Sequence, residues 1–194
     1  LLRDVLARTL EHGKGVVHCD VKPANILATV RKVSPQGHRD AVSAPPGGNK
    51  QTWGGPASAS ELVTDIKLSD FGSVMNLQSE RTQVFRVGSL AYMPPEQLDG
   101  DALDCRADIY ALAGVLYHLI AGRAPFDATQ QAALMHQIYH AEPPSLLLQR
   151  DGVPPRLDRL IARALSKRRE DRHADWDSFA QELSALVEQG THLL

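Results

Sequence analysis

The sequence predicts a mainly α-helical domain that carries one small β-hairpin. Four segments in its second half have apolar residues at helical spacing, and the most apolar of them, residues 104–121, has them on nearly every face. Two short segments in the first half, residues 26–30 and 66–68, have the composition of strands that can pair. The chain has 194 residues and 43% hydrophobic content, which suffices to bury the core of one ordinary domain.

The first part of the chain is expected to begin with a helix. Apolar residues recur there at helical spacing until Gly13 and Gly15 interrupt the pattern, so this helix should end near His12. A short extended stretch is expected to follow around Val16 and Val17.

A long segment without apolar periodicity separates the two predicted strands. Residues 34–60 are rich in Pro, Gly, Ser and Ala. A loop of this length inside a compact domain ordinarily counts against the strands beside it, but both of its flanks carry motifs that outweigh this objection. We therefore predict an insertion loop, placed at residues 31–63.

The second half begins with the most apolar helix. Residues 104–121 predict a helix that is buried among others, and Gly122 offers its stop. The next helix is expected to begin with Asp127 as its N-cap, with Gln130 bonding back to the cap. Its inward residues should be Leu134 and Ile138.

Two more helices complete the predicted fold. Pro155 is expected to open one of them and Asp175 to cap the other. The expected apolar stripes are Leu157, Leu160, Ile161, Ala164 and Leu165 on the first, and Trp176, Phe179, Leu183 and Leu186 on the second.

Composition argues against several classes of protein. The 21 Lys and Arg residues are balanced by 23 Asp and Glu without long blocks of one sign, so no nucleic-acid partner is expected. The longest apolar run, residues 109–121, is shorter than the roughly 20 residues of a membrane-spanning helix, so no membrane segment is expected in this stretch. The two cysteines, Cys19 and Cys105, do not suggest a disulfide scaffold, which favours a reducing, cytoplasmic location.

Because the chain opens on Leu1, inside a helical pattern, it is expected to be a piece of a longer protein.

Two short motifs carry the chemistry. Residues 18–25 are His-Cys-Asp-Val-Lys-Pro-Ala-Asn, and residues 70–72 are Asp-Phe-Gly. Transfer of a terminal phosphoryl group needs a carboxylate that orients the acceptor, cations beside the phosphate oxygens, and oxygen ligands for magnesium. The two motifs contain all of these groups and therefore indicate phosphoryl transfer.

In these motifs and their order, the sequence resembles the eukaryotic-type serine/threonine protein kinase family, and residues 93–98 are similar to its bacterial members. The match is to the large, C-terminal lobe of the protein-kinase-like fold, over residues 1–194, with the small N-terminal lobe absent. The resemblance implies transfer of the γ-phosphoryl group of ATP to Ser or Thr of protein substrates. It implies ATP and Mg²⁺ (or Mn²⁺) as cofactors.

The resemblance also implies roles for individual residues. Asp20 would be the catalytic carboxylate that accepts a hydrogen bond from the substrate hydroxyl. Lys22 would act in catalysis and in nucleotide binding by placing a positive charge near the transferring phosphate. Asn25 and Asp70 would bind the metal and the nucleotide through their side-chain oxygens. The structural residues of the two motifs would be His18, Phe71 and Gly72.

A third motif, residues 88–96, resembles the end of the family's activation segment. Its last three residues are Pro-Pro-Glu where the family has Ala-Pro-Glu, and Ser89 stands where serine/threonine kinases have a hydroxyl residue beside the catalytic aspartate. In the family this glutamate pairs with a distant arginine, so Glu96 is expected to pair with Arg172. Asp108 matches the aspartate that braces the backbone of the catalytic loop.

Cys19 departs from the family, which commonly has Arg at this position. Such an arginine neutralises a phosphate on the activation loop. Switching by phosphorylation of Ser79 or Thr82 is therefore less expected.

Two other functions remain open. A pseudokinase is possible because the 194 residues contain no glycine-rich phosphate loop, strand lysine or partner glutamate, so the chain alone is expected to bind ATP poorly and not to turn over. A small-molecule phosphotransferase would share related aspartates. Residues 88–96, which suit a peptide substrate, argue against that second alternative.

Overall fold

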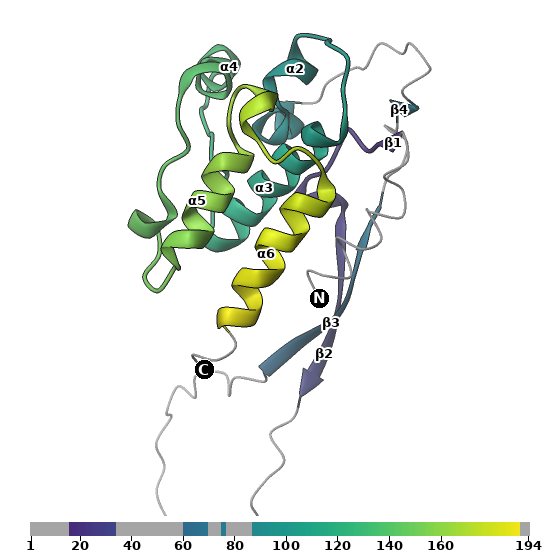
Figure 1. The fold of residues 1–194 in the computed structure, drawn as a ribbon, viewed down its shortest axis with the longest axis vertical. Helices are drawn as coiled ribbons and strands as arrows, with labels where there is room; N and C mark the ends of the chain where they lie inside the picture. The colour runs from purple at the N-terminus through teal and green to yellow at the C-terminus, as the bar shows by residue number, and fades with distance from the viewer. Residues whose placement is uncertain (1–15, 34–59, 70–74, 77–86, 191–194) are drawn as a thin grey trace, which may run out of the picture.

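The computed structural model describes residues 16–33, 60–69, 75–76 and 87–190. These residues form a mostly helical unit with two small antiparallel sheets (Figure 1). The α-helices are α2 (Pro95–Leu98), α3 (Cys105–Ala121), α4 (Gln131–His140), α5 (Pro155–Ala164) and α6 (Trp176–Gly190). Short 3₁₀ helices are η1 (Pro23–Asn25), η3 (Val87–Tyr92), η4 (Leu146–Leu148) and η5 (Arg169–Asp171). The predicted mainly α-helical class with a small hairpin is confirmed, and the helix predicted to end near His12 lies outside the described residues.

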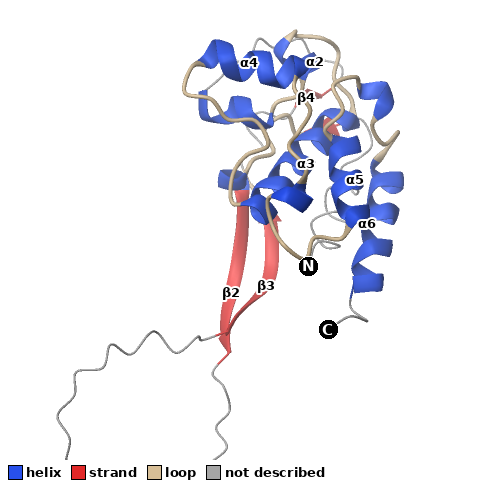
Figure 2. Cartoon of the chain, turned by 90° about the vertical axis from the view of Figure 1, so that its left-hand side faces the viewer, coloured by secondary structure: helices blue, strands red, loops and turns tan. Residues whose placement is uncertain are grey.

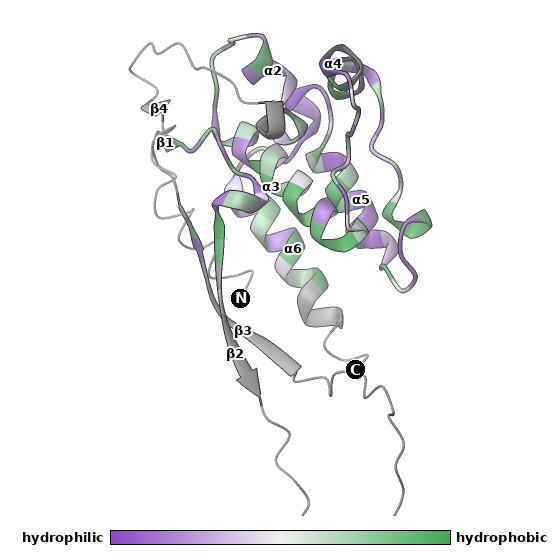
Figure 3. Ribbon diagram, turned by 180° about the vertical axis from the view of Figure 1, so that it is seen from behind, coloured by the Kyte–Doolittle hydropathy of each residue, from purple (hydrophilic) through white to green (hydrophobic). Residues whose placement is uncertain are grey.

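Helix α3 is the centre of the unit, as its apolar sequence predicts. It packs against α5, α6 and η3, and hydrophobic residues dominate along it in Figure 3. Asp104 caps its start by accepting the backbone N–H of Arg106, and Gly122 ends it with a φ of 75°, in the left-handed region that glycine adopts readily. No helix in the described part of the chain combines the length and the apolar character needed to span a bilayer.

Helices α5 and α6 begin where the sequence predicts. Pro155 is the first residue of α5, and Leu160 and Ile161 are fully buried. Asp175 accepts the backbone N–H of Ser178 at 2.8 Å, while the Ser178 hydroxyl accepts the N–H of Asp175 at 3.3 Å. This reciprocal cap at the start of α6 brings Phe179 into the core with no exposed surface.

Helix α4 begins later than predicted. Asp127 is not its N-cap: Gln130 occupies that position without a side-chain bond, and the helix starts at Gln131. The reason is a bond from further along the chain, because the side-chain amide of Gln137 accepts the N–H of Asp127 at 3.0 Å and donates to its carbonyl at 3.2 Å. Asp127 is thereby held outside the helix. The predicted inward residues, Leu134 and Ile138, are buried.

The predicted hairpin is present, but its strands are longer than predicted. Strand β2 (Ile26–Val33) pairs antiparallel with β3 (Ser60–Leu68), and the register opposes Ile26 to Leu68 and Val33 to Ser60. The predicted insertion over 31–63 is therefore too long at both ends. Ladder hydrogen bonds come from the backbone, so polar residues continue a strand after the apolar run stops. Residues 34–59 lie outside the described residues.

The hairpin extends away from the helices, and Figure 2 shows it projecting below them. At its inner end the chain passes directly into the loop of residues 18–25. The extended stretch predicted at Val16 and Val17 is confirmed as β1, which pairs with β4 (Met75–Asn76). The loop of residues 18–25 thus lies between two small sheets and the helical core.

Candidate active site

Asp20 is the centre of a compact cluster of polar side chains. Its Oδ2 atom accepts hydrogen bonds from Lys22 Nζ at 2.7 Å and from Asn25 Nδ2 at 3.0 Å. Asn25 Nδ2 also donates to the backbone carbonyl of Asp20 at 2.8 Å. No hydrogen bond joins Oδ1 to another described residue. One carboxylate oxygen is therefore fixed, and the other can accept a hydrogen bond from a second molecule.

The local sequence explains why these three side chains converge. Lys22 is fully extended, with φ −153° and ψ 162°, and the next residue, Pro23, opens the single turn η1. Proline suits this first position because its fixed φ matches a helical turn and its missing N–H would have no partner there. The turn closes when the N–H of Asn25 donates to the carbonyl of Lys22 at 3.0 Å. It returns Asn25 to the side of Asp20.

Asn25 also connects this cluster to the second motif. Its backbone carbonyl accepts the N–H of Ser69 at 2.8 Å and the Ser69 hydroxyl at 3.0 Å. Ser69 directly precedes Asp70 in the chain, while residues 70–72 themselves, the predicted Asp-Phe-Gly, lie outside the described residues. The predicted metal ligand Asn25 therefore contacts, through its backbone, the last described residue before Asp70.

The Asn25 side chain fits the requirements of a hard metal ligand. Because both bonds to Asp20 use its Nδ2, the amide orientation is set and Oδ1 is left to coordinate a cation. Mg²⁺ and Mn²⁺ prefer such oxygen ligands. The described residues contain no group of three or more His, Cys, Asp or Glu that could hold a metal ion alone.

The backbone before Asp20 has an uncommon conformation. Cys19 has a φ of 64°, in the left-handed region that non-glycine residues rarely adopt. Its N–H donates to Asp108 Oδ1 at 2.9 Å, and its carbonyl accepts from Gln97 Nε2 at 2.7 Å. Bonds on both sides of this residue hold a conformation that typically costs about 1–3 kcal/mol. The peptide that leads into Asp20 is therefore fixed in orientation.

Asp108 supports the loop from the start of α3. Its Oδ2 atom accepts the N–H of His18 at 2.7 Å, in addition to the bond from Cys19. Burial raises the pKa of the Asp108 carboxyl to about 6, and the two backbone N–H groups act in the opposite direction. The His18 ring is buried as well, and its Nδ1 accepts the N–H of Asp20 at 3.4 Å. Both side chains contact the loop backbone.

Glu96, in α2, forms an ion pair with Arg172. Arg172 Nη1 lies 2.5 Å from Glu96 Oε1, and Nη2 lies 2.8 Å from Oε2. Both residues are buried. This two-point geometry, in which parallel N–H groups face both carboxylate oxygens, is the strongest arrangement of such a pair.

The segment before α2 is fixed to the middle of α3. Tyr92 Oη lies 2.6 Å from His118 Nδ1, and burial, followed by the charge of Asp127, raises the pKa of the Tyr92 hydroxyl. The Tyr92 ring passes over Gly114, where a Cβ atom would lie only 3.2 Å from ring atom Cδ1. Ser89 belongs to the same segment by its backbone, in η3, but its side chain lies outside the described part of the structure.

Three of these contacts and one backbone conformation were not predicted from the sequence. The contacts are those of Gln97, of Ser69 and of the Tyr92–His118 pair, and the conformation is the left-handed φ of Cys19. Only Gln97 had a signal in the sequence, because it is a polar residue that directly follows Glu96, the last residue of the third motif.

The sequence of the chain is similar to those of known proteins. The family model described as "Protein kinase domain" matches residues 6–184. The chain is 32% identical over 193 residues to the serine/threonine-protein kinase PknL of Mycobacterium tuberculosis, which covers 97% of this chain and 40% of that protein. It is 33% identical over 183 residues to the serine/threonine-protein kinase pkn3 of Myxococcus xanthus, covering 90% of this chain and 28% of that protein.

A third relative has a similar but weaker match. The serine/threonine-protein kinase PknB of Mycobacterium tuberculosis is 27% identical over 171 residues, which cover 86% of this chain and 22% of that protein. The chain thus spans at most 40% of the length of these curated relatives.

Proposed function

The chain belongs to the protein kinase domain family, and from this premise we propose that it forms the substrate-side part of a protein that transfers the γ-phosphoryl group of ATP to Ser or Thr of other proteins. The observation that carries the proposal is the Asp20 cluster: Oδ2 is held by Lys22 and Asn25 while Oδ1 can accept a bond from another molecule. In this reading residues 1–194 correspond to the large lobe of the kinase fold. The three relatives are named serine/threonine kinases, which supports the proposed acceptor.

The proposed chemistry begins at Asp20. The substrate hydroxyl donates a hydrogen bond to Asp20 Oδ1, which orients its oxygen toward the γ-phosphorus of ATP and accepts its proton as the new P–O bond forms. The bond from the γ-phosphorus to the bridging oxygen breaks, and the electron pair leaves with ADP. Lys22, 2.7 Å from Oδ2, is placed to offset negative charge on the transferring group.

The metal would be held by Asn25 through Oδ1, with Asp70 as the second proposed ligand. A divalent cation, Mg²⁺ or Mn²⁺, supplies charge neutralisation on the phosphate oxygens when bound. The chain's own contribution is orientation: Asp20 holds the Asn25 amide by two bonds, and Ser69 holds its backbone beside the segment that leads to Asp70.

The remaining proposed roles concern support and setting. Residues 88–96 are proposed to face the protein substrate, and Glu96, Arg172 and Asp108 to hold that segment and the catalytic loop in place. A cytoplasmic setting is proposed because Cys19 and Cys105 are both free thiols.

The test is transfer of radiolabelled γ-phosphate by the purified full-length protein. We expect labelling of a generic basic protein, and we expect Asp20→Asn to lower kcat by about a hundredfold to ten-thousandfold, the range typical of positioned acid–base groups. The matched control is Asp101→Asn, an exposed aspartate outside the cluster, which should retain full rate. Labelling of small alcohols but not of proteins, or equal rates for Asp20→Asn and the unmodified protein, would refute the proposal.

A further inference from the structure

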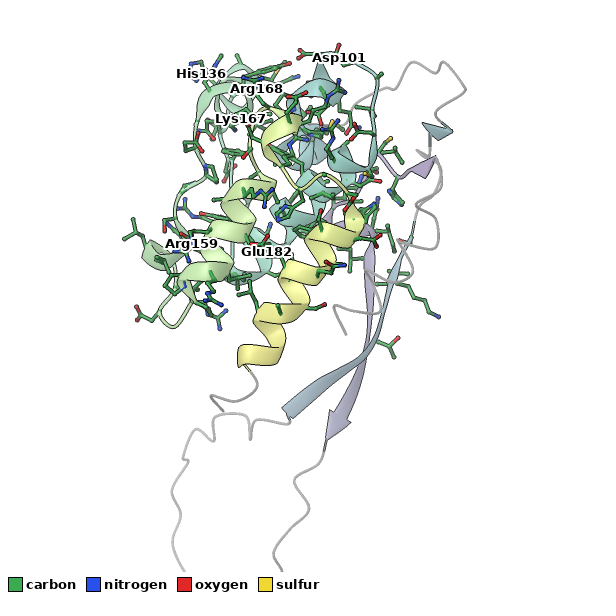
Figure 4. The ribbon with its side chains drawn as sticks, in the orientation of Figure 1. Asp101, His136, Arg159, Lys167, Arg168 and Glu182 are labelled. Atoms are coloured by element: carbon green, nitrogen blue, oxygen red, sulfur yellow. The ribbon has the colours of Figure 1, made fainter. Side chains whose placement is uncertain are left out.

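Two histidines on α4 lie outside every contact described above. His136 and His140 are four residues apart, so they occupy the same face of the helix, one turn apart. Both are exposed. Their ring centroids are 4.8 Å apart and their planes are inclined by 55°. Figure 4 shows His136 at the outer edge of the helical unit. The pair therefore presents two imidazoles side by side to solvent.

The helix that carries them is firmly held from its other side. Leu134 and Ile138 anchor α4 in the core with 6% and 0% exposure. Near its C-terminal end, Lys167 Nζ donates to the carbonyl of Gln137 at 3.0 Å, and the Gln137 side chain bonds both backbone groups of Asp127. The histidine pair is thus mounted on a fixed segment of helix, which lowers the entropic cost of placing both rings around one ligand.

We propose that His136 and His140 form a binding site for one divalent transition-metal ion of the Zn²⁺, Ni²⁺ or Cu²⁺ class. Two histidines at this helical spacing can bind one metal from the same face. Each metal–nitrogen bond is about 2.1 Å long, so two coordinating nitrogens lie within about 4.2 Å of each other. Rings with centroids 4.8 Å apart are close enough for rotation of the side chains to bring two nitrogens within this distance.

The ligand type separates this site from the proposed catalytic metal. Imidazole nitrogen suits Zn²⁺, Ni²⁺ and Cu²⁺, whereas Mg²⁺ takes oxygen ligands. Among the described residues, no other His, Cys, Asp or Glu joins His136 and His140 as a third potential metal ligand. The remaining coordination positions are therefore left to water or to a group from another molecule, as in an open metal site.

The test is calorimetric titration of the full-length protein, without an affinity tag, with Ni²⁺ in excess Mg²⁺. We expect His136→Gln and His140→Gln each to weaken Ni²⁺ binding at this site by about tenfold or more. Even the loss of a residue that only hydrogen-bonds to a metal ligand typically lowers metal affinity by about 10- to 100-fold. Binding of nickel at other sites of the protein is common to the variant and the unmodified protein, so its contribution cancels when their titrations are compared.

A relocated pair supplies the matched control. Ala132 is exposed and lies four residues before His136 on the same helix. Adding Ala132→His to His140→Gln therefore recreates the spacing one turn earlier and should restore the affinity. Equal affinity in the single variants and the unmodified protein, or no recovery in the double variant, overturns the proposal. Neither readout depends on kinase activity, so this result is independent of the proposed function.

Discussion

Arg172 directs all five of its N–H donors to acceptors around the carboxylate of Glu96. Besides the two bonds to Glu96, its Nε donates to the carbonyl of Ser166 at 2.8 Å, Nη1 to that of Arg106 at 3.1 Å, and Nη2 to that of Lys167 at 3.0 Å. The guanidinium carbon also lies 4.8 Å from the centre of the Tyr110 ring. One side chain therefore connects α2, α3 and the segment between α5 and η5.

Removal of the Glu96 charge should be strongly destabilising. Glu96→Gln leaves the Arg172 charge buried without its anionic partner, and breaking a buried pair in this way typically costs about 3–5 kcal/mol. We expect the purified Glu96→Gln variant to unfold at a lower urea midpoint than the unmodified protein, with unfolding monitored by tryptophan fluorescence. The control is Glu170→Gln, which removes the partner of the exposed Arg168 and the partly exposed Arg169 and should leave the midpoint unchanged. Equal midpoints for the two variants would contradict the prediction.

The helices of this fold could be predicted wherever the determining signals are local. Helix α3 shows its apolar sequence and both caps within residues 104–122, and Pro155 and Asp175 identify the starts of α5 and α6. The start of α4 could not be predicted, because a side chain ten residues away, that of Gln137, holds Asp127 outside the helix. The full length of the hairpin was also missed, since backbone pairing extends past the apolar residues.

The same distinction applies to the candidate site. Asp20, Lys22 and Asn25 fall within one six-residue stretch, so their convergence follows from a single turn. Gln97 reaches Cys19 from 78 positions away, and no local pattern indicates that contact. The φ of Cys19 has no signal either, because cysteine, unlike glycine or asparagine, is not enriched in the left-handed region. Tertiary contacts impose it.

This backbone conformation predicts a substitution effect at Cys19. A β-branched side chain tolerates positive φ poorly, so Cys19→Val should destabilise the protein by about 1–3 kcal/mol, the usual range for local backbone strain. The matched control is Cys105→Val. Cys105 is helical, where valine costs less than about 0.7 kcal/mol by propensity. Urea midpoints measure both effects, and a Cys105 variant as unstable as the Cys19 variant would count against strain as the cause.

Asp108 predicts an unusual dependence of stability on pH. Its pKa of about 6 in the folded state lies above the value of about 3.9 for an unfolded aspartate. Between these values the folded state keeps a proton that the unfolded state has lost, so the stability contributed by this residue rises as the pH falls. From pH 7 to pH 5 the gain should be about 1 kcal/mol.

The measurement is the difference in free energy of unfolding between the unmodified protein and Asp108→Asn at these two pH values. The variant cannot titrate at this position, so other carboxylates cancel in the difference. We expect the unmodified protein to gain relative to the variant at pH 5. A constant difference, or a relative loss at pH 5, would show that the pKa of Asp108 is not raised by burial.

At Gly114, which lies against the ring of Tyr92, two effects of opposite sign on stability compete. Replacing glycine by alanine inside a helix ordinarily stabilises by about 1 kcal/mol. At Gly114 the new methyl group would lie 3.2 Å from Tyr92 Cδ1, and the bond to His118 keeps that ring from moving away. Such overpacking costs about 1–3 kcal/mol, so Gly114→Ala should be destabilising overall. In a Tyr92→Ala background the contact is gone, and the same substitution should stabilise. Urea unfolding of the four proteins in this cycle measures the coupling, and an unchanged sign in the two backgrounds would mean that Tyr92 does not require the glycine.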